Sequence, residues 1–446
     1  MKILLVNPPR SPYNGILKHA PEEAKHFIHK KLIGPPLGLL TIAAGIKDYD
    51  LSFVDLKGQY DLDANTPALA VYIKSIIEKE KPDIIGVTFI ASEFPYGIEI
   101  FEVAKSVNKQ ILTVAGGLHA SLCPSDFDNK CVDVVCIGQA AGIFREVVIA
   151  KEKNTDFASI GGIYYRKNNV FIKSTAKQKP WFAASQNFLL PERRLLNPWL
   201  STYKVGNSPF PATYLFTSLG CPYKCTFCSI WCQYDGAYYQ RKVESVIEEL
   251  KTLSDFPIVR FADANTVVDT VFINKLFDRI VEEGIKKEYV MDIRFDTVVN
   301  NPKLIEKIAK AGLKVVICGF ESYRNEELIK YNKSTQASLL HKAIEILHDN
   351  NIMIRGNYVV PNHYTIDDFK ALSEYASTHP VVYAGYTILS PMPGTPYYEE
   401  VKDEIIDHNL LKYNFFNSVL PTKMPLEEFY YNTAKLWLIK KGNDVI

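Results

Sequence analysis

Short runs of valine, isoleucine and leucine alternate with helix-like stretches along most of this 446-residue chain. In the first part they predict strands at 2–7, 51–56, 83–90, 111–116 and 132–138, with helices between them. Apolar runs without polar alternation, separated by helices, are typical of a parallel sheet covered on both faces. The sequence therefore predicts an α/β fold that begins with a doubly wound, Rossmann-like domain over residues 1–152.

The second half repeats the alternation without a reversal. Six apolar runs predict strands at 212–218, 258–263, 289–295, 315–320, 352–360 and 382–389. Six consecutive strand–helix units predict a partial (β/α)6 barrel over residues 212–396. Residues 153–211 combine a hairpin pattern with several prolines and are predicted to be a linker. An amphipathic stretch in 397–446 predicts a C-terminal helical cap.

Charge and composition exclude several partners. The net charge is +1 at 47% hydrophobic residues, which offers no electrostatic footprint for nucleic acid. No apolar run reaches membrane-spanning length, and the N-terminal sequence lacks the features of a signal peptide. Eight cysteines in such a chain indicate a reducing compartment. We expect a cytoplasmic protein with no nucleic-acid partner and no transmembrane segment.

Three of the cysteines stand close together as Cys221, Cys225 and Cys228. Thiolates are the ligands of iron–sulfur clusters, and three of them leave one iron of a [4Fe-4S] cluster open. A structural zinc site prefers four ligands, usually as two separated pairs. Cys232 follows shortly after and would close the cluster if it were a ligand. We expect Cys232 to be a bystander.

The predicted carboxyl ends of the strands carry polar residues and glycines. In the barrel these are Asp263, Arg294 and Glu321, where Arg294 offers a forked donor for a carboxylate and Glu321 offers acceptors. In the first domain the glycines would let backbone approach a large ligand. Since no G-x-G-x-x-G motif occurs there, a dinucleotide is not favoured.

The cysteine triplet resembles the signature of the radical S-adenosylmethionine (SAM) superfamily. The resemblance implies that SAM chelates the open iron, and that the reduced cluster cleaves it to a 5′-deoxyadenosyl radical. It also implies an external electron donor of the flavodoxin or ferredoxin type. Phe227 matches an aromatic position near the adenine, and the motifs around Arg294 and Glu321 match SAM-binding motifs. Asp263 is a further expected SAM contact.

The first domain resembles the cobalamin-binding domain that precedes many radical SAM cores. The fragments that match imply the following cobalamin contacts: Asn7, Pro36, Leu37, Thr88, Gly116, Gly117, His119, Gly138 and Gln139. The stretch Gly138-Gln139-Ala140-Ala141 departs from the usual acidic motif. The D-x-H-x-x-G motif is missing, which implies cobalamin bound without a histidine beneath cobalt. We expect His119 to be a loop histidine near the corrin and not a cobalt ligand.

Together these resemblances imply a cobalamin-dependent radical SAM methyltransferase. Its expected substrate is an unactivated carbon of a metabolite, lipid or peptide, with one SAM methylating cobalamin and a second yielding the radical. Two alternatives stay open. One is a cyclase or rearrangement enzyme that uses both cofactors without methyl transfer. The other is a non-catalytic cobalamin-binding or electron-transfer protein.

Overall fold

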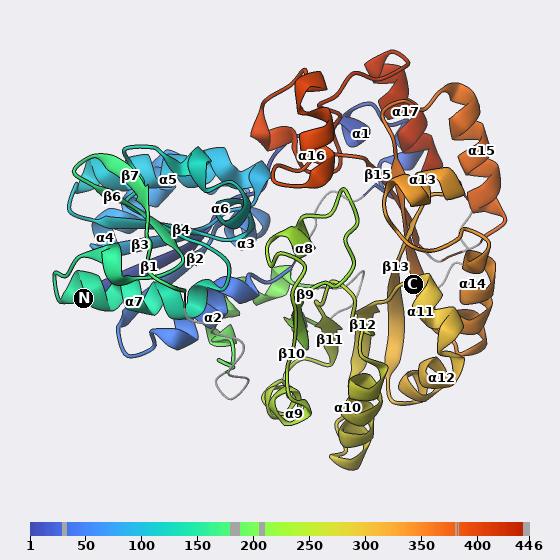
Figure 1. Cartoon of the computed structure of the whole chain (residues 1–446), viewed down its shortest axis with the longest axis horizontal. Helices are drawn as coiled ribbons and strands as arrows, with labels where there is room; N and C mark the ends of the chain where they lie inside the picture. The colour runs from blue at the N-terminus through green and yellow to red at the C-terminus, as the bar shows by residue number, and fades with distance from the viewer. Residues whose placement is uncertain (29–33, 179–187, 205–209, 380, 382, 440–446) are drawn as a thin grey trace. The chain divides into compact units, whose positions relative to one another are not determined.

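Two compact units make up the computed structural model, which describes all residues except 29–33, 179–187, 205–209, 380, 382 and 440–446 (Figure 1). The first unit contains Met1–Pro12, Pro35–Tyr203 and Cys232–Tyr234. The second contains Tyr13–Gly34, Lys204–Trp231 and Asp235–Ile446. The segment Tyr13–Gly34, which follows the first strand in the sequence, therefore belongs to the second unit.

The first unit is built on a sheet in the order β2-β1-β3-β4-β5-β6-β7. Its parallel strands are β1 (Lys2–Asn7), β2 (Asp50–Asp55), β3 (Ile84–Thr88), β4 (Leu112–Gly116) and β5 (Val134–Cys136). The main helices between them are α2 (Leu37–Gly45), α4 (Leu69–Glu80), α5 (Phe94–Val107) and α7 (Ala140–Glu152). The predicted doubly wound fold is confirmed. The strand order reverses between β1 and β3, where such sheets form their ligand crevice.

Strand β1 shows why the predicted apolar runs are continuous. Leu4 and Val6 enter the core on one face of the sheet, while Ile3 and Leu5 enter the core on the other. All four side chains are fully buried. Successive side chains of a strand point to opposite faces, so burial of both faces removes polar alternation.

The predicted hairpin extends the first sheet. Strands β6 (Ile163–Lys167) and β7 (Val170–Lys173) pair antiparallel, and β6 pairs with β5. Asn168 and Asn169 join them with φ values of 50° and 64°. Positive φ at both turn residues matches the twist of a two-residue hairpin, and asparagine tolerates it. The hairpin is thus part of the first sheet, inside the stretch predicted to be a linker.

The second unit holds six parallel strands in the order β15-β14-β13-β12-β11-β8. They are β8 (Ala212–Leu215), β11 (Ile258–Phe261), β12 (Glu288–Asp292), β13 (Leu313–Glu321), β14 (Met353–Val360) and β15 (Tyr383–Ile388). The connecting helices include α9 (Val243–Lys251), α10 (Thr270–Glu282), α12 (Pro302–Lys310), α14 (Leu339–Asp349) and α15 (Ile366–Ser377). The predicted six-stranded partial barrel is confirmed.

A short ribbon separates β8 from β11. Strands β9 (Ser218–Gly220) and β10 (Tyr238–Gln240) pair antiparallel on either side of the cysteine loop. The predicted first barrel strand, 212–218, is therefore too long, because β8 ends at Leu215 and Ser218 begins β9.

The C-terminal helix α17 (Leu426–Leu436) packs on α1 (Gly15–Lys18) of the early segment. Gly15 donates its N–H to Asn417 Oδ1 at 2.8 Å, and Ile16 donates its N–H to the carbonyl of Phe416. A Cβ at Gly15 would collide with the ring of Tyr430. The glycine therefore permits this close approach of segments about 400 residues apart.

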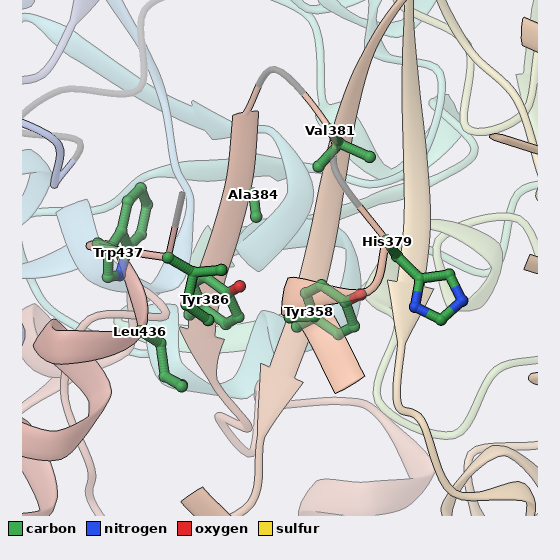
Figure 2. Close-up of a pocket in the computed structure, with 9 residues that line it drawn as sticks. Tyr358, His379, Val381, Ala384, Tyr386, Leu436 and Trp437 are labelled. Carbon is green, nitrogen blue, oxygen red and sulfur yellow. The ribbon is translucent and has the colours of Figure 1, made fainter. Parts of the chain in front are cut away.

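A small hollow lies beside β14 and β15, where Tyr358, Tyr386 and Trp437 line it (Figure 2). The two tyrosine rings are stacked with centroids 5.3 Å apart, and neither hydroxyl has a hydrogen-bond partner among the described residues. The space holds roughly one water molecule. His379, Val381 and Ala384 place it at the amino end of β15, away from the strand ends that carry barrel chemistry. No helix in the described part of the chain has the length and apolar character to cross a membrane.

Candidate functional site

The cysteine loop is pinned from two other parts of the second unit. Thr226 donates its N–H to the carbonyl of Tyr331 at 3.1 Å, and Tyr397 donates its N–H to the carbonyl of Thr226 at 3.0 Å. Within the loop region, the indole of Trp231 donates to the carbonyl of Cys225 at 2.8 Å. Cys221 and Cys225 are buried and Cys228 is half-buried. The loop is therefore a preformed element on the barrel.

The three thiols fit a cluster better than a single ion. Among the described residues, only His119, Cys123 and Asp126 place three potential ligand atoms within 4.8 Å of one another. The three sulfur atoms of the cysteine triplet are therefore spaced more widely than that. A cubane spaces its thiolates more widely than one metal ion does. Burial raises the pKa of each thiol, to about 11 for Cys228. Iron would reverse this, because ligation requires and stabilises thiolates.

Arg294, at the end of β12, contacts the cysteine loop directly. Its guanidinium carbon lies 4.1 Å from the ring centroid of Tyr223, between Cys221 and Cys225. This distance is that of a cation–π contact. The same guanidinium donates to both carboxylate oxygens of Asp296 at 3.0 and 2.8 Å, and to the carbonyl of Lys333 at 2.5 Å. The Arg294 guanidinium thus forms an ion pair with Asp296 at the strand end and also contacts the cysteine loop.

Glu321, at the end of β13, forms a buried ion pair that the sequence did not suggest. The Nζ of Lys333 lies 2.6 Å from its Oε1, and both side chains are about nine-tenths buried. Glu321 has φ 58°, a left-handed conformation that is uncommon for a residue other than glycine. A Cβ at Gly319 would collide with the Glu321 carboxylate. The backbone here is shaped to place an opposite-charge pair over the strand end, and such strain concentrates at functional sites.

This pair has the complementarity that an amino-acid moiety needs. Glu321 offers acceptors for an ammonium group, and Lys333 and Arg294 offer donors for a carboxylate. Burial raises the pKa of Cys225, and the Lys333 ammonium group partly opposes this rise, which places its charge near the cluster thiols. Asn265, after β11, is 3% exposed and neither atom of its amide has a partner in the described structure. Buried polar groups are rarely left unpaired, so these residues fit a polar cofactor such as SAM.

Asp263 braces the approach to the cysteine loop. Its carboxylate accepts hydrogen bonds from the backbone N–H groups of Thr217 and Ser218 at 2.8 and 2.6 Å, and from both of their hydroxyls. These bonds bend the chain between β8 and β9, just before Gly220 and Cys221. Asp263 thus holds the cysteine loop in place, while its predicted SAM contact stays a prediction.

Full burial raises the pKa of Asp263 from 3.8 to about 6, against the effect of its four donors. The native protein then binds this proton more tightly than the unfolded chain between about pH 4 and 6. The contribution of Asp263 to stability is full below pH 4 and declines by roughly 3 kcal/mol as the pH rises to 6. We expect the free energy of unfolding of the wild type, relative to Asp263→Asn, to fall over this range in urea titrations. The exposed Asp255→Asn variant is the control, and a flat difference for Asp263→Asn would contradict the prediction.

Phe227 lies between the cysteines and an apolar cluster. Its ring meets that of Tyr331 edge-on, with centroids 5.4 Å apart, and it packs on a cluster that includes Leu389 and Tyr397. Phe227 thus packs against Tyr331 and Tyr397, the same two residues that pin Thr226. Its predicted place beside adenine stays a prediction.

In the first unit, the predicted cobalamin contacts gather at the carboxyl ends of neighbouring strands. Asn7 ends β1 and donates to Asp55 Oδ1 of β2 at 2.8 Å. Thr88 ends β3 and is in register with Gly116 at the end of β4. A Cβ at Gly116 would meet no atom within 4 Å, so this glycine borders open space. These positions fit a large ligand at the strand-order reversal.

The remaining predicted contacts begin helices or loops at the same end. Gly117 precedes α6 (Leu118–Leu122) with φ 97°, and Gly138 follows β5 with φ 70°. Pro36 and Gln139 are the N-cap residues of α2 and α7, and Leu37 is buried. Gly117 is required by both its backbone angle and its packing, since a Cβ there would lie 2.7 Å from Phe89 N.

His119 is turned into the protein. Its side chain is 1% exposed, Phe94 and Phe127 flank the ring, and Nε2 lies 3.0 Å from Asp126 Oδ2. His119 therefore lies in α6 and not in a loop, while its predicted place near the corrin stays a prediction.

Two family descriptions match the chain in this order. The B12 binding domain matches residues 28–148, and the radical SAM superfamily matches residues 215–376. An uncharacterized methyltransferase of Pyrococcus horikoshii is 27% identical over 95% of this chain and 88% of its own length. The hopanoid C-3 methylase of Methylococcus capsulatus is 22% identical over 90% and 75%. An anaerobic magnesium-protoporphyrin IX monomethyl ester cyclase of Rubrivivax gelatinosus is 24% identical over 78% and 63%.

The fold has a counterpart among solved structures. The radical SAM methyltransferase TsrM of Kitasatospora setae, solved with cobalamin and a [4Fe-4S] cluster, aligns with a TM-score of 0.66 at 16% identity. The alignment covers 90% of this chain and 78% of that one. With both domains present in sequence and in fold, the chain belongs to the cobalamin-dependent radical SAM enzymes. Its cofactors are a [4Fe-4S] cluster, SAM and cobalamin.

Three residues of the site escaped the sequence analysis as contacts. Lys333 pairs with Glu321, and Tyr223 makes a cation–π contact with Arg294. Asn265 is a buried amide after β11. For Asn265 a usable signal existed, because it follows β11 two residues after Asp263. Lys333 follows a short helix and carries no such positional signal.

Proposed function

We propose that this enzyme transfers a methyl group from SAM to an unactivated carbon of a metabolite, lipid or peptide. The observation that supports the use of SAM is the buried Lys333–Glu321 pair beside Arg294 and the cysteine loop. The methyltransferase relatives, matched over 88% and 75% of their own length, support methyl transfer over other uses of the two cofactors. When bound, the cluster and cobalamin supply one-electron chemistry and methyl carriage, which protein side chains cannot supply.

The side chains position SAM and exclude water. Cys221, Cys225 and Cys228 hold the cluster. Glu321 would accept from the ammonium group of SAM, and Arg294 and Lys333 would donate to its carboxylate.

The apolar cluster around Phe227 and Tyr331 excludes water on one side of the loop. Exclusion of water protects a reactive intermediate from side reactions. An electron donor of the flavodoxin or ferredoxin type and a cytoplasmic location complete the proposal.

The test is an anaerobic incubation of the reconstituted holoenzyme with methyl-labelled SAM and a small-molecule, lipid or peptide pool. Labelled product together with S-adenosylhomocysteine and deoxyadenosine supports the proposal. An unlabelled product with deoxyadenosine contradicts it and favours cyclisation or rearrangement, the activity class of the Rubrivivax cyclase relative. Absence of both nucleosides contradicts catalysis and favours a binding or electron-transfer role.

A further inference from the structure

A compact group of potential metal ligands lies in the first unit, apart in sequence from the cluster cysteines. His119, Cys123 and Asp126 place one ligand atom each within 4.8 Å of one another. His119 and Cys123 are one helical turn apart, and Cys123 donates its N–H to the carbonyl of His119 at 2.8 Å. The 3-10 helix Pro124–Phe127 then returns Asp126 to the same place.

The histidine is buried without a hydrogen bond that would explain its nitrogen. Its Nε2 lies 3.0 Å from Asp126 Oδ2, yet the atoms are not aligned for a hydrogen bond, and Nε2 has no other partner among the described residues. A buried nitrogen that makes no hydrogen bond is rare in folded proteins. A cation between nitrogen and carboxylate gives this nitrogen a partner and uses the observed separation.

We propose that His119, Cys123 and Asp126 bind one divalent transition-metal ion of the zinc class. Imidazole, thiolate and carboxylate are ligands of zinc, whereas calcium and magnesium prefer oxygen alone. Three protein ligands leave a fourth position for water, and the partly exposed Cys123 and Asp126 give an entry path. The ion would tie α6 to the following 3-10 helix at the end of β4, and it gives His119 Nε2 a partner other than cobalt.

The test uses the full-length holoenzyme with its cluster and cobalamin loaded. After equilibration with zinc and dialysis into metal-free buffer, elemental analysis is expected to find about one zinc per chain in the wild type. Cys123→Ser is expected to bind zinc at least about tenfold more weakly, with iron and cobalamin content unchanged, and His119→Gln is also expected to bind zinc at least about tenfold more weakly. Asp128→Asn is the matched control, because Asp128 is an exposed carboxylate two residues from Asp126 and pairs with Arg166.

X-ray absorption at the zinc edge supplies a second readout, with one sulfur and the remainder nitrogen or oxygen expected. Absence of zinc in the wild type overturns the proposal. Equal zinc in the wild type and in Cys123→Ser also overturns it, since the ion then lies elsewhere. A loss of iron that accompanies the loss of zinc points to the cluster thiols and counts against the site.

Discussion

Replacing Cys225 by alanine is expected to abolish reductive cleavage of SAM. Cys225 is buried in a loop fixed by hydrogen bonds to Tyr331, Tyr397 and Trp231, so the fold sets the position of its thiol. Loss of a residue in the outer shell of a metal site already costs 10–100-fold, and loss of a ligand costs more. We expect deoxyadenosine formation to fall at least about a hundredfold and the iron–sulfur absorbance to disappear.

The control is Cys232→Ala. Cys232 ends the short helix α8 (Ser229–Cys232) after the triplet. If the triplet alone holds the cluster, this variant retains its iron and its deoxyadenosine yield. Loss of iron from Cys232→Ala would instead make Cys232 a fourth ligand and would contradict an open iron.

Replacing Lys333 by methionine is expected to destabilise the second unit by about 3–5 kcal/mol. The substitution leaves the carboxylate of Glu321 buried, in a left-handed backbone position and without its charge partner. Urea unfolding of the apoprotein measures the effect. The double variant Lys333→Met with Glu321→Gln is expected to recover part of the loss, because it removes the unpaired buried charge.

Lys330→Met is the matched control. Lys330 lies three residues earlier and pairs with Glu400 on the surface, where both side chains are more than half exposed. Exposed pairs contribute about 0–1 kcal/mol, so this variant should unfold almost as the wild type does. If Lys333→Met and Lys330→Met lowered the free energy of unfolding equally, the buried Lys333–Glu321 pair would contribute no more than the exposed pair, and the prediction would be contradicted. Weaker SAM binding by Lys333→Met alone, measured by calorimetry, is the matching functional expectation.

The fold was predictable because its signals are local. The run Lys2–Asn7 is apolar on both faces, and the strand has the predicted bounds. Strand ends were less predictable. The first barrel strand stops at Leu215 and not at 218, because the Asp263 carboxylate, about 45 residues later, accepts hydrogen bonds from the backbone N–H groups of Thr217 and Ser218.

Site residues could be predicted from the sequence only where polar side chains directly follow a predicted strand. Arg294 and Glu321 occupy strand ends, where β/α barrels carry their chemistry, and their SAM contacts stay predictions. Lys333 lies twelve residues beyond Glu321, between Asn332 and Ser334, which both have positive φ. These turns bring its ammonium group back to the carboxylate, and no periodic pattern encodes that return.

The sequence by itself determined the order of strands and helices, the two sheets and the three thiols, because periodicity and spacing depend on near neighbours. Only the tertiary structure decided that the hairpin extends the first sheet, that 13–34 joins the second unit, and that Lys333 pairs with Glu321. It also brought His119, Cys123 and Asp126 together around a buried nitrogen that makes no hydrogen bond in the described structure. These outcomes depend on chain reversals and burial, which arise from contacts that spacing alone does not specify.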